Sequence, residues 1–332
     1  MEIKFTIKNQ NILEAEQDVL LLKYAQDFYG VDRKIMELLD KEGYEVGQII
    51  CPPDGFRLIE NPISDLSYKY LLFLGVSDLR SFNYKRIRKF ARKALTSLAA
   101  ELPNVESIAC TIHGPGYGLD EIEAFNSQIA GFVDALRSKD CPKNLEELFF
   151  YELNRGRSNR LEKALNSIFK DEKVQITNDR IVYESEHEDE TEEILRSVGY
   201  ESDSKPVAFV AMPFSKDKND VYHYGIQNAV KRAGFLCERI DEVPFTGSIV
   251  KNIKKKIKKA NFVVADLSNA NPNVYLEVGF AWGLDKPTIF VIDDIDSLKF
   301  DVNSQRCLTY DSIKELEETL FKEIDSMKDR FT

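Results

Sequence analysis

The sequence predicts an α/β protein of two domains, each built on a largely parallel β-sheet. Short apolar runs such as YLLFLGV (70–76) and FVVAD (262–266) are typical of buried parallel strands. Segments with helical spacing follow most of these runs, as expected for alternating βα units. At 332 residues the chain is long enough for about two domains. A strongly acidic stretch between the two series of units marks the expected boundary.

Composition excludes several classes of protein. No run approaches the ~18 apolar residues of a membrane helix, and the N-terminus, MEIKFTIKNQ, alternates like a strand rather than a signal peptide. A net charge of −11 argues against a broad nucleic-acid surface. The five cysteines and three histidines show no metal-ligand spacing. We therefore expect a cytoplasmic protein with reduced thiols and without a metal site.

The first domain is expected over residues 1–170. Its predicted strands lie at 1–7, 18–22, 70–76, from 107, and at 147–153. Its predicted helices lie at 30–43, 84–98, 121–136 and 158–169.

A glycine-rich loop follows the strand that starts at Ser107. Its candidate ligand-binding residues are His113, Gly114, Gly116, Tyr117 and Gly118. Glycines let backbone N–H groups approach a phosphate, and the next helix would offer its positive N-terminus. The alternative is a tight turn that needs positive φ and binds nothing.

Three segments of this half, DVLLLKYAQDFYGVDRKIMELL, YKYLLFLGVSDLRSFNYKRIRKFARKALTSL and SIACTIHGPGYGLDEIEAF, resemble the macro-type fold. They are similar in particular to the amino-terminal domain of leucyl aminopeptidases, over roughly residues 15–140. The resemblance implies a three-layer macro-like domain whose glycine-rich loop holds the diphosphate of an ADP-ribose-like ligand. It therefore implies a nucleotide-sensing or assembly role. Peptidase activity does not transfer, because the aminopeptidase catalytic domain and its metal ligands are absent from this sequence.

Residues 171–204 are predicted to be an acidic linker. Seven acidic residues crowd into 184–193, which favours a solvated spacer with at most a short helix near 191–198.

The second domain is expected over residues 205–332 as a flavodoxin-like, doubly wound parallel sheet. Its predicted strands lie at 207–212, 235–240, 261–267, 287–292 and 307–310, and its helices at 222–233, 248–260, 274–284 and 313–327. The common strand order 2-1-3-4-5 with right-handed crossovers would bring the strand ends at Met212 and Asp266 together.

Ligands of open α/β sheets bind beyond the carboxyl ends of the strands, where three groups of residues are expected to converge. These are the Met212-Pro213-Phe214 loop, Arg239 with Asp241, and Asp266 with Asn271, Asn273, Tyr275 and Glu277. Each has a structural alternative. An aspartate at a strand end often caps a turn, a glutamate early in a helix suits the macrodipole, and aromatic residues often belong to the core.

The segments VAMPF and IVKNIKKKIKKANFVVADLSNANPNVYLEVGFAWGLDKPTIFVI resemble the nucleoside 2-deoxyribosyltransferase-like group of the TIR-related superfamily, bacterial domains found in defence systems. This resemblance implies that Glu277 is the catalytic carboxylate and that Asp266 contacts or positions the ribose. True deoxyribosyltransferases carry a second aspartate six residues before the glutamate, where this chain has Asn271. That departure favours the NAD-cleaving TIR-like members over base exchange.

We therefore expect an NAD⁺ glycohydrolase of a bacterial antiphage defence system, with NAD⁺ as substrate and no separate cofactor. Homo-oligomerisation and activation by a nucleotide second messenger at the first domain are part of this expectation. A carboxylate would stabilise the cationic sugar formed when the C1′–N bond breaks. Nicotinamide leaves without a general acid, whereas a purine or pyrimidine would need one, supplied by Asp266 or Asp241. The alternatives are a nucleoside 2-deoxyribosyltransferase or hydrolase, and a non-catalytic nucleotide receptor.

Overall fold

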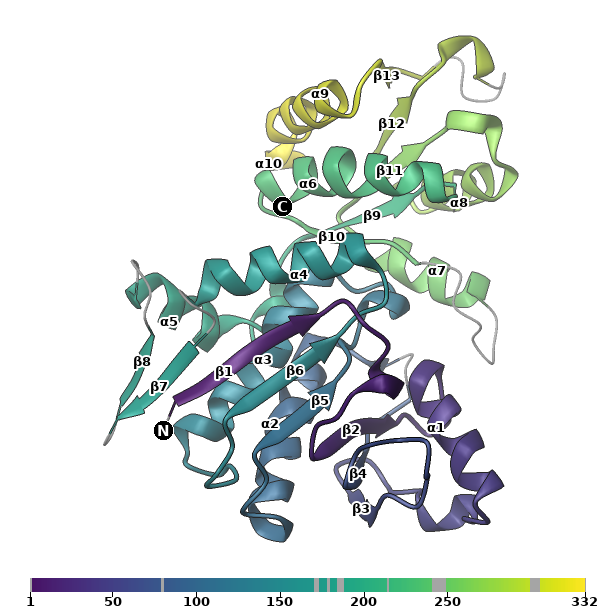
Figure 1. Ribbon diagram of the computed structural model, residues 1–332. Coiled ribbons are helices and arrows are strands. Elements are labelled where there is room, and N and C mark those ends of the chain that lie inside the picture. The colour runs from purple at the N-terminus through teal and green to yellow at the C-terminus, as the bar shows by residue number, and fades with distance from the viewer. Residues whose placement is uncertain are drawn as a thin grey trace. The chain divides into compact units, whose positions relative to one another are not determined.

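The computed structural model describes residues 2–78, 81–169, 173–177, 180–183, 188–213, 215–240, 249–298 and 305–331. The chain divides into two compact units. The first comprises Met1–Pro115 with Glu121–Asp203, and the second comprises Gly116–Asp120 with Ser204–Thr332. Each unit contains its own sheet and its own helices, which Figure 1 labels along the chain.

The first unit is built on a mixed eight-stranded sheet in the order β3-β4-β2-β5-β6-β1-β7-β8. The five central strands, β4, β2, β5, β6 and β1, are parallel, and β3, β7 and β8 add antiparallel edges. The strands are β1 (Glu2–Lys8), β2 (Val19–Tyr24), β3 (Phe56–Glu60), β4 (Tyr70–Gly75), β5 (Ser107–Cys110), β6 (Glu147–Tyr151), β7 (Lys173–Thr177) and β8 (Arg180–Tyr183).

The helices of the first unit pack with their apolar faces buried. The helices are α1 (Gly30–Lys41), α2 (Tyr84–Glu101), α3 (Glu121–Arg137), α4 (Arg155–Ile168) and α5 (Glu188–Ser197). In α1, Ile35 and Leu39 pack with Leu20 and Leu22 of β2. Helices α2 and α3 pack closely, and a Cβ on Gly131 would lie only 2.1 Å from the carbonyl oxygen of Arg88. The α2–α3 contact therefore requires glycine at position 131.

The segment predicted as a linker over 171–204 contains β7, β8 and α5. Strand β7 pairs antiparallel with β1, which extends the sheet. The side chains of Leu195 and Val198, at the end of α5 and just beyond it, are buried. Their spacing of three places both on one helical face, and the dense acidic residues around them masked this pattern in the sequence. The segment is thus an integral part of the first unit rather than a spacer.

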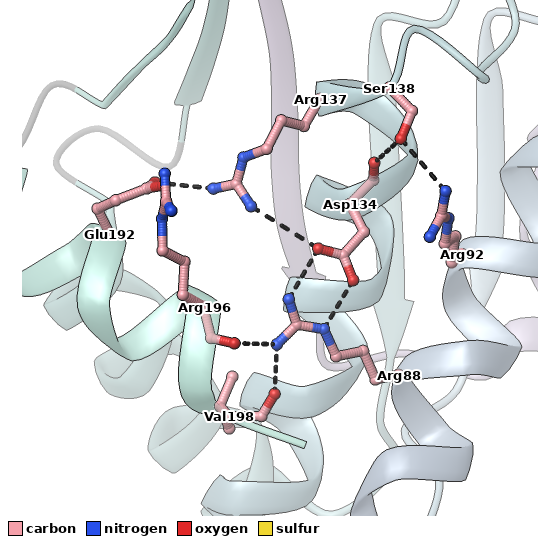
Figure 2. Close-up of polar contacts among 8 residues, drawn as sticks. All are labelled: Arg88, Arg92, Asp134, Arg137, Ser138, Glu192, Arg196 and Val198. Carbon is pink, nitrogen blue, oxygen red and sulfur yellow. Dashed lines mark hydrogen bonds and ion pairs between the residues drawn. The ribbon is translucent and has the colours of Figure 1, made fainter. Parts of the chain in front are cut away.

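A buried arginine on α2 joins α5 to this unit (Figure 2). Arg88 donates two hydrogen bonds of 2.7 Å to the carboxylate of Asp134 on α3. It also donates to the carbonyl oxygens of Val198, at 2.5 Å, and Arg196, at 3.1 Å. Its guanidinium lies over the ring of Tyr200 at 4.2 Å. One side chain therefore connects three helices and the turn after α5.

The second unit contains a five-stranded parallel sheet in the order β10-β9-β11-β12-β13. The strands are β9 (Val207–Ala211), β10 (Leu236–Glu238), β11 (Phe262–Asp266), β12 (Thr288–Ile292) and β13 (Cys307–Thr309). In chain order this arrangement is 2-1-3-4-5, and it confirms the predicted doubly wound α/β fold.

Helices cover both faces of this sheet because its strands alternate apolar side chains between the two sides. Val264 and Val291 share one core with α6 (Asn228–Arg232) and α9 (Ile313–Ser326). Ala265 and Ile292 share the opposite core with α7 (Ile249–Lys259) and α8 (Pro272–Trp282). The predicted helix over 222–233 begins as a π-helix, Val221–Gln227, and continues as α6. A short helix α10 (Lys328–Phe331) ends the described chain.

None of the helices in the described part of the chain combines the length and the apolar character needed to cross a membrane.

Candidate active site

Asp266 is the last residue of β11 and is completely buried. One carboxylate oxygen accepts a 3.0 Å hydrogen bond from the backbone N–H of Ser268. The other oxygen faces the ammonium of Lys218 at 3.6 Å, an ion-pair distance longer than a hydrogen bond. Burial raises the pKa of Asp266, although the hydrogen bonds from Ser268 and the charge of Lys218 oppose this shift. At the end of β11, Asp266 thus contributes a buried carboxylate with an ion-pair partner.

Lys218 connects the carboxyl ends of three strands. Its ammonium donates to Asp293, directly after β12, at 2.7 Å and to the hydroxyl of Tyr310, directly after β13, at 3.4 Å. Burial disfavours the charge of Lys218, but the hydrogen bond to Asp293 and the charge of Asp266 outweigh it and raise its pKa. The Ser268 hydroxyl accepts a 3.2 Å hydrogen bond from the backbone N–H of Asp293. The result is a fixed charged network at the strand ends, where this fold class binds ligands.

Glu277 lies in the second turn of α8 and differs from Asp266 in having no such network. Among the described residues, no hydrogen-bond donor or cation pairs with its carboxylate. Burial alone raises the pKa of Glu277 to about 7. A carboxyl group with this pKa is divided between its charged and neutral forms near neutral pH, as suits a catalytic acid, base or charge stabiliser. No hydrogen bond or ion pair joins it to Asp266 in the described chain.

Two other predicted site residues contact each other. The guanidinium of Arg239, which follows β10, donates to the Met212 sulfur at 3.4 Å and lies over the ring of Tyr222 at 3.8 Å. Pro213 is buried next to Met212. Strands β9 and β10 are neighbours, so their carboxyl ends bring Met212 and Arg239 together as predicted.

Asn271 caps α8. Its side chain accepts a 2.9 Å hydrogen bond from the backbone N–H of Asn273, and Pro272 begins the helix. Asn273 is exposed, and Tyr275 packs partly against the core of the α7 and α8 face. The structural role of Asn271 is therefore a helix cap. Phe214 and Asp241 lie outside the described residues.

The glycine-rich loop is divided between the two units. His113 and Gly114 belong to the first unit, whereas Gly116, Tyr117 and Gly118 belong to the second. His113 is buried with its ring edge against Phe90 at 4.5 Å. Burial, aided by the charge of Lys23, holds the pKa of His113 well below its usual range. The imidazole is therefore neutral at physiological pH.

Gly118 has a φ of +78° and Gly114 a φ of +115°, the backbone conformation that the alternative interpretation as a tight glycine turn requires. Within the second unit, Lys256 donates to the carbonyl oxygen of Gly118 at 2.9 Å. Asp120 pairs with Lys231 at 3.0 Å. Binding of a diphosphate by this loop stays a prediction.

Lys218, Ser268, Asp293 and Tyr310 were not among the site residues predicted from the sequence. Asp293 could have been found, because it follows an apolar strand just as Asp266 does. Lys218 carries no comparable signal, because it lies in the polar segment KDKND among other charged residues. No group of three or more His, Cys, Asp or Glu side chains in the described ranges could hold a metal ion.

No protein-family model matches the sequence, and no curated protein matches it. The solved structures similar to the chain include macrodomains and a TIR domain. A Trypanosoma brucei macrodomain in complex with ADP-ribose is 19% identical with a TM-score of 0.39, over 49% of this chain and 69% of that chain. An Oceanobacillus iheyensis macrodomain with ADP is 13% identical with a TM-score of 0.39, over 50% of this chain and 95% of that chain. The TIR domain of the Toll-related receptor TRR-2 from Hydra magnipapillata is 15% identical with a TM-score of 0.31, over 38% of this chain and 98% of that chain.

Proposed function

We propose that the second unit cleaves the N-glycosidic bond of NAD⁺. Water replaces nicotinamide at C1′ of the ribose, which yields ADP-ribose, nicotinamide and one proton. Nicotinamide leaves as a neutral molecule from a cationic substrate, so no group has to protonate it. The requirement is a negative charge that stabilises the cationic sugar.

The proposal depends mainly on the buried surroundings of the Glu277 carboxyl group. An unpaired, largely desolvated carboxylate is costly in the free protein and becomes favourable when a positive charge enters its surroundings. A nicotinamide nucleotide brings such a charge and would lower the pKa of Glu277 on binding. The negative form would then be present during bond cleavage, when positive charge develops on the sugar.

Asp266 has a positioning role in this proposal. Its hydrogen bond from Ser268 and its ion pair with Lys218 fix the carboxylate at the end of β11. A group held in this way suits binding of ribose hydroxyls better than proton transfer, because its partners leave it little freedom to move.

Nicotinamide release from NAD⁺ by the full chain tests the assignment of Glu277. We expect Glu277→Gln to lower the rate about 10²–10³-fold, the usual effect of removing one preorganised electrostatic group. Asp285→Asn is the matched control, because Asp285 is an exposed carboxylate just after α8 at φ +53°, a conformation that asparagine tolerates. Equal rates in the wild type and Glu277→Gln would remove Glu277 from the mechanism.

We also propose nucleotide sensing by the domain predicted over residues 1–170, through its glycine-rich loop from His113 to Gly118. The assay is therefore run with and without ADP-ribose and cyclic nucleotides. Stimulated nicotinamide release supports a nucleotide-activated effector.

We further propose homo-oligomerisation and a role in antiphage defence. Loss of protection in cells that express Glu277→Gln tests the role in defence. Binding of these nucleotides with no cleavage of any glycosidic bond would favour a receptor instead.

A second candidate, nucleoside deoxyribosyl transfer or hydrolysis, is favoured by one specific observation. A Glu277 with a pKa of about 7 is partly protonated near neutral pH and could donate a proton to a departing base. From the sequence, Asp266 or Asp241 was expected to be this acid instead. Incubation with deoxynucleosides and a free base separates the candidates, because only transfer exchanges the base.

A further inference from the structure

The first unit contains a pocket that lies apart from the glycine-rich loop. It has a volume of about 230 Å³ and is formed by the end of β4, the turn before β3 and one face of α2. None of the residues 113–118 lines it. Phe90 forms one wall, and the same ring contacts His113.

Three cations of α2 line this pocket. Arg86, Lys89 and Lys93 share one helical face because they are three and seven residues apart. Arg86 uses one N–H group for the carbonyl oxygen of Ser81, which orients its guanidinium. The ammonium of Lys93 lies over the ring of Phe56 at 5.5 Å. This concentration of positive charge is notable in a chain whose net charge is −11.

A buried hydroxyl adds a second feature that points to a ligand. Ser77, two residues after β4, lines the pocket, and its oxygen is buried without a hydrogen-bond partner among the described residues. Buried polar atoms are seldom left unpaired, because desolvation without a partner costs free energy. A bound group that accepts or donates a hydrogen bond at this point would remove that cost.

Asp54 is the one acidic residue among those that line the pocket. Its backbone N–H donates to the carbonyl oxygen of Gly75 at 3.0 Å, which holds the turn against the end of β4. A carboxylate in the same pocket as three cations would weaken binding of a bare phosphate but would accept hydrogen bonds from sugar hydroxyls, as acidic residues do in nucleotide-binding folds.

We propose that this pocket binds a small sugar phosphate. Arg86, Lys89 and Lys93 hold the phosphate through charge-assisted hydrogen bonds. Asp54 and Ser77 hold the hydroxyl groups of the sugar. The volume of about 230 Å³ lies below the usual range for larger ligands, so a dinucleotide does not fit within it. The site is independent of the glycosidic chemistry proposed for the second unit.

Titration calorimetry of the full chain with ribose 5-phosphate, inorganic phosphate and ribose tests the proposal. We expect saturable one-to-one binding of ribose 5-phosphate, weaker binding of phosphate and no measurable binding of ribose. Lys89→Ala combined with Lys93→Ala should weaken ribose 5-phosphate binding at least about tenfold, since each charge-assisted contact contributes about that factor.

The matched control combines Lys85→Ala and Arg92→Ala. These residues are exposed cations of the same helix that do not line the pocket, so the net charge changes equally. This control should alter the dissociation constant less than twofold. Equal weakening by both pairs, or no saturable binding of ribose 5-phosphate by the wild type, would overturn the proposal.

Two single variants separate the role of the sugar from that of the phosphate. Asp54→Asn should weaken ribose 5-phosphate binding but leave phosphate binding unchanged or tighter. Ser77→Ala should weaken ribose 5-phosphate binding without lowering the melting temperature, because the hydroxyl has no hydrogen-bond partner to lose in the described part of the chain. If both variants bind ribose 5-phosphate as the wild type does, the sugar contacts are wrong.

Discussion

At Glu277 a carboxyl group has lost most of its contact with water without gaining a partner among the described residues, and the pKa of about 7 follows from that loss. The carboxyl groups of Asp266 and Asp293 share Lys218, so their surroundings compensate their charge. The second unit thus contains two types of carboxylate. Asp266 at the end of β11 and Asp293 after β12 are fixed by partners, whereas Glu277 on α8 can respond to a ligand.

The uncompensated charge of Glu277 should affect stability in a pH-dependent way. The folded protein holds the proton up to about pH 7, whereas the unfolded chain releases it near the ordinary value of 4.5. Compared with a variant whose side chain at position 277 is always neutral, the wild type therefore becomes less stable as pH rises between these two values. Above pH 7 the difference no longer changes. We expect the stability advantage of Glu277→Gln over wild type to grow by on the order of 2 kcal/mol from pH 5.5 to pH 8.

Trp282, the single tryptophan, lies on the same helix and reports this unfolding by its fluorescence. Asp285→Asn serves again as control and should follow the wild type at both pH values. An advantage of Glu277→Gln that does not change with pH would show that the pKa of Glu277 is not raised.

Lys218 should be essential to its network, because its removal leaves Asp266 charged and completely buried. We expect Lys218→Met to lower stability by about 3 kcal/mol at pH 8. The loss should become smaller as pH falls, because burial raises the pKa of Asp266 and a protonated carboxyl group needs no cation beside it. The same Trp282 signal measures it, with the exposed Lys251→Met as control. Equal losses in the two variants would mean that Lys218 has no special electrostatic role.

Among the helices, the packing of α5 on α2 and α3 depends on polar contacts as well as on buried apolar side chains. Arg88 satisfies two carbonyl oxygens at and beyond the end of α5 while it pairs with Asp134 on α3 (Figure 2). Loss of this arginine would leave a poorly hydrated carboxylate and two unsatisfied carbonyls together. Such a loss is among the more damaging single changes to a folded protein.

We expect Arg88→Ala to destabilise the first unit by about 3–5 kcal/mol. Backbone amides of α5 should then exchange faster with solvent, which hydrogen exchange detected by mass spectrometry measures. Arg92→Ala is the control, because its side chain is exposed and its one hydrogen bond within the described ranges is a 3.4 Å contact with Ser138. Faster exchange throughout the unit, with no preference for α5, would contradict the specific role of Arg88.

The second unit could be predicted from sequence more fully than the first. Its strands are continuous apolar runs bounded by turns, so their positions and that of Asp266 at a strand end could be predicted directly, whereas their order in the sheet was predicted from the common doubly wound arrangement. The contacts of Lys218 could not be predicted, because its partners follow strands that lie 48 to 92 positions further along the chain. Likewise, strand β7 is short and its residues do not form a continuous apolar run. Its pairing with β1 joins segments that are far apart in the sequence, so it could not be predicted locally.

For the protein's activity, our central claim is that the negative form of Glu277 drives cleavage of NAD⁺. The pH dependence of kcat/KM for nicotinamide release tests that claim most directly, because it reports the ionisation of the free enzyme. We predict a plateau above about pH 7 and a decrease to about one tenth at pH 6, with no such dependence in the residual activity of Glu277→Gln. A kcat/KM that is constant between pH 6 and pH 8, or that falls as pH rises, would contradict the account.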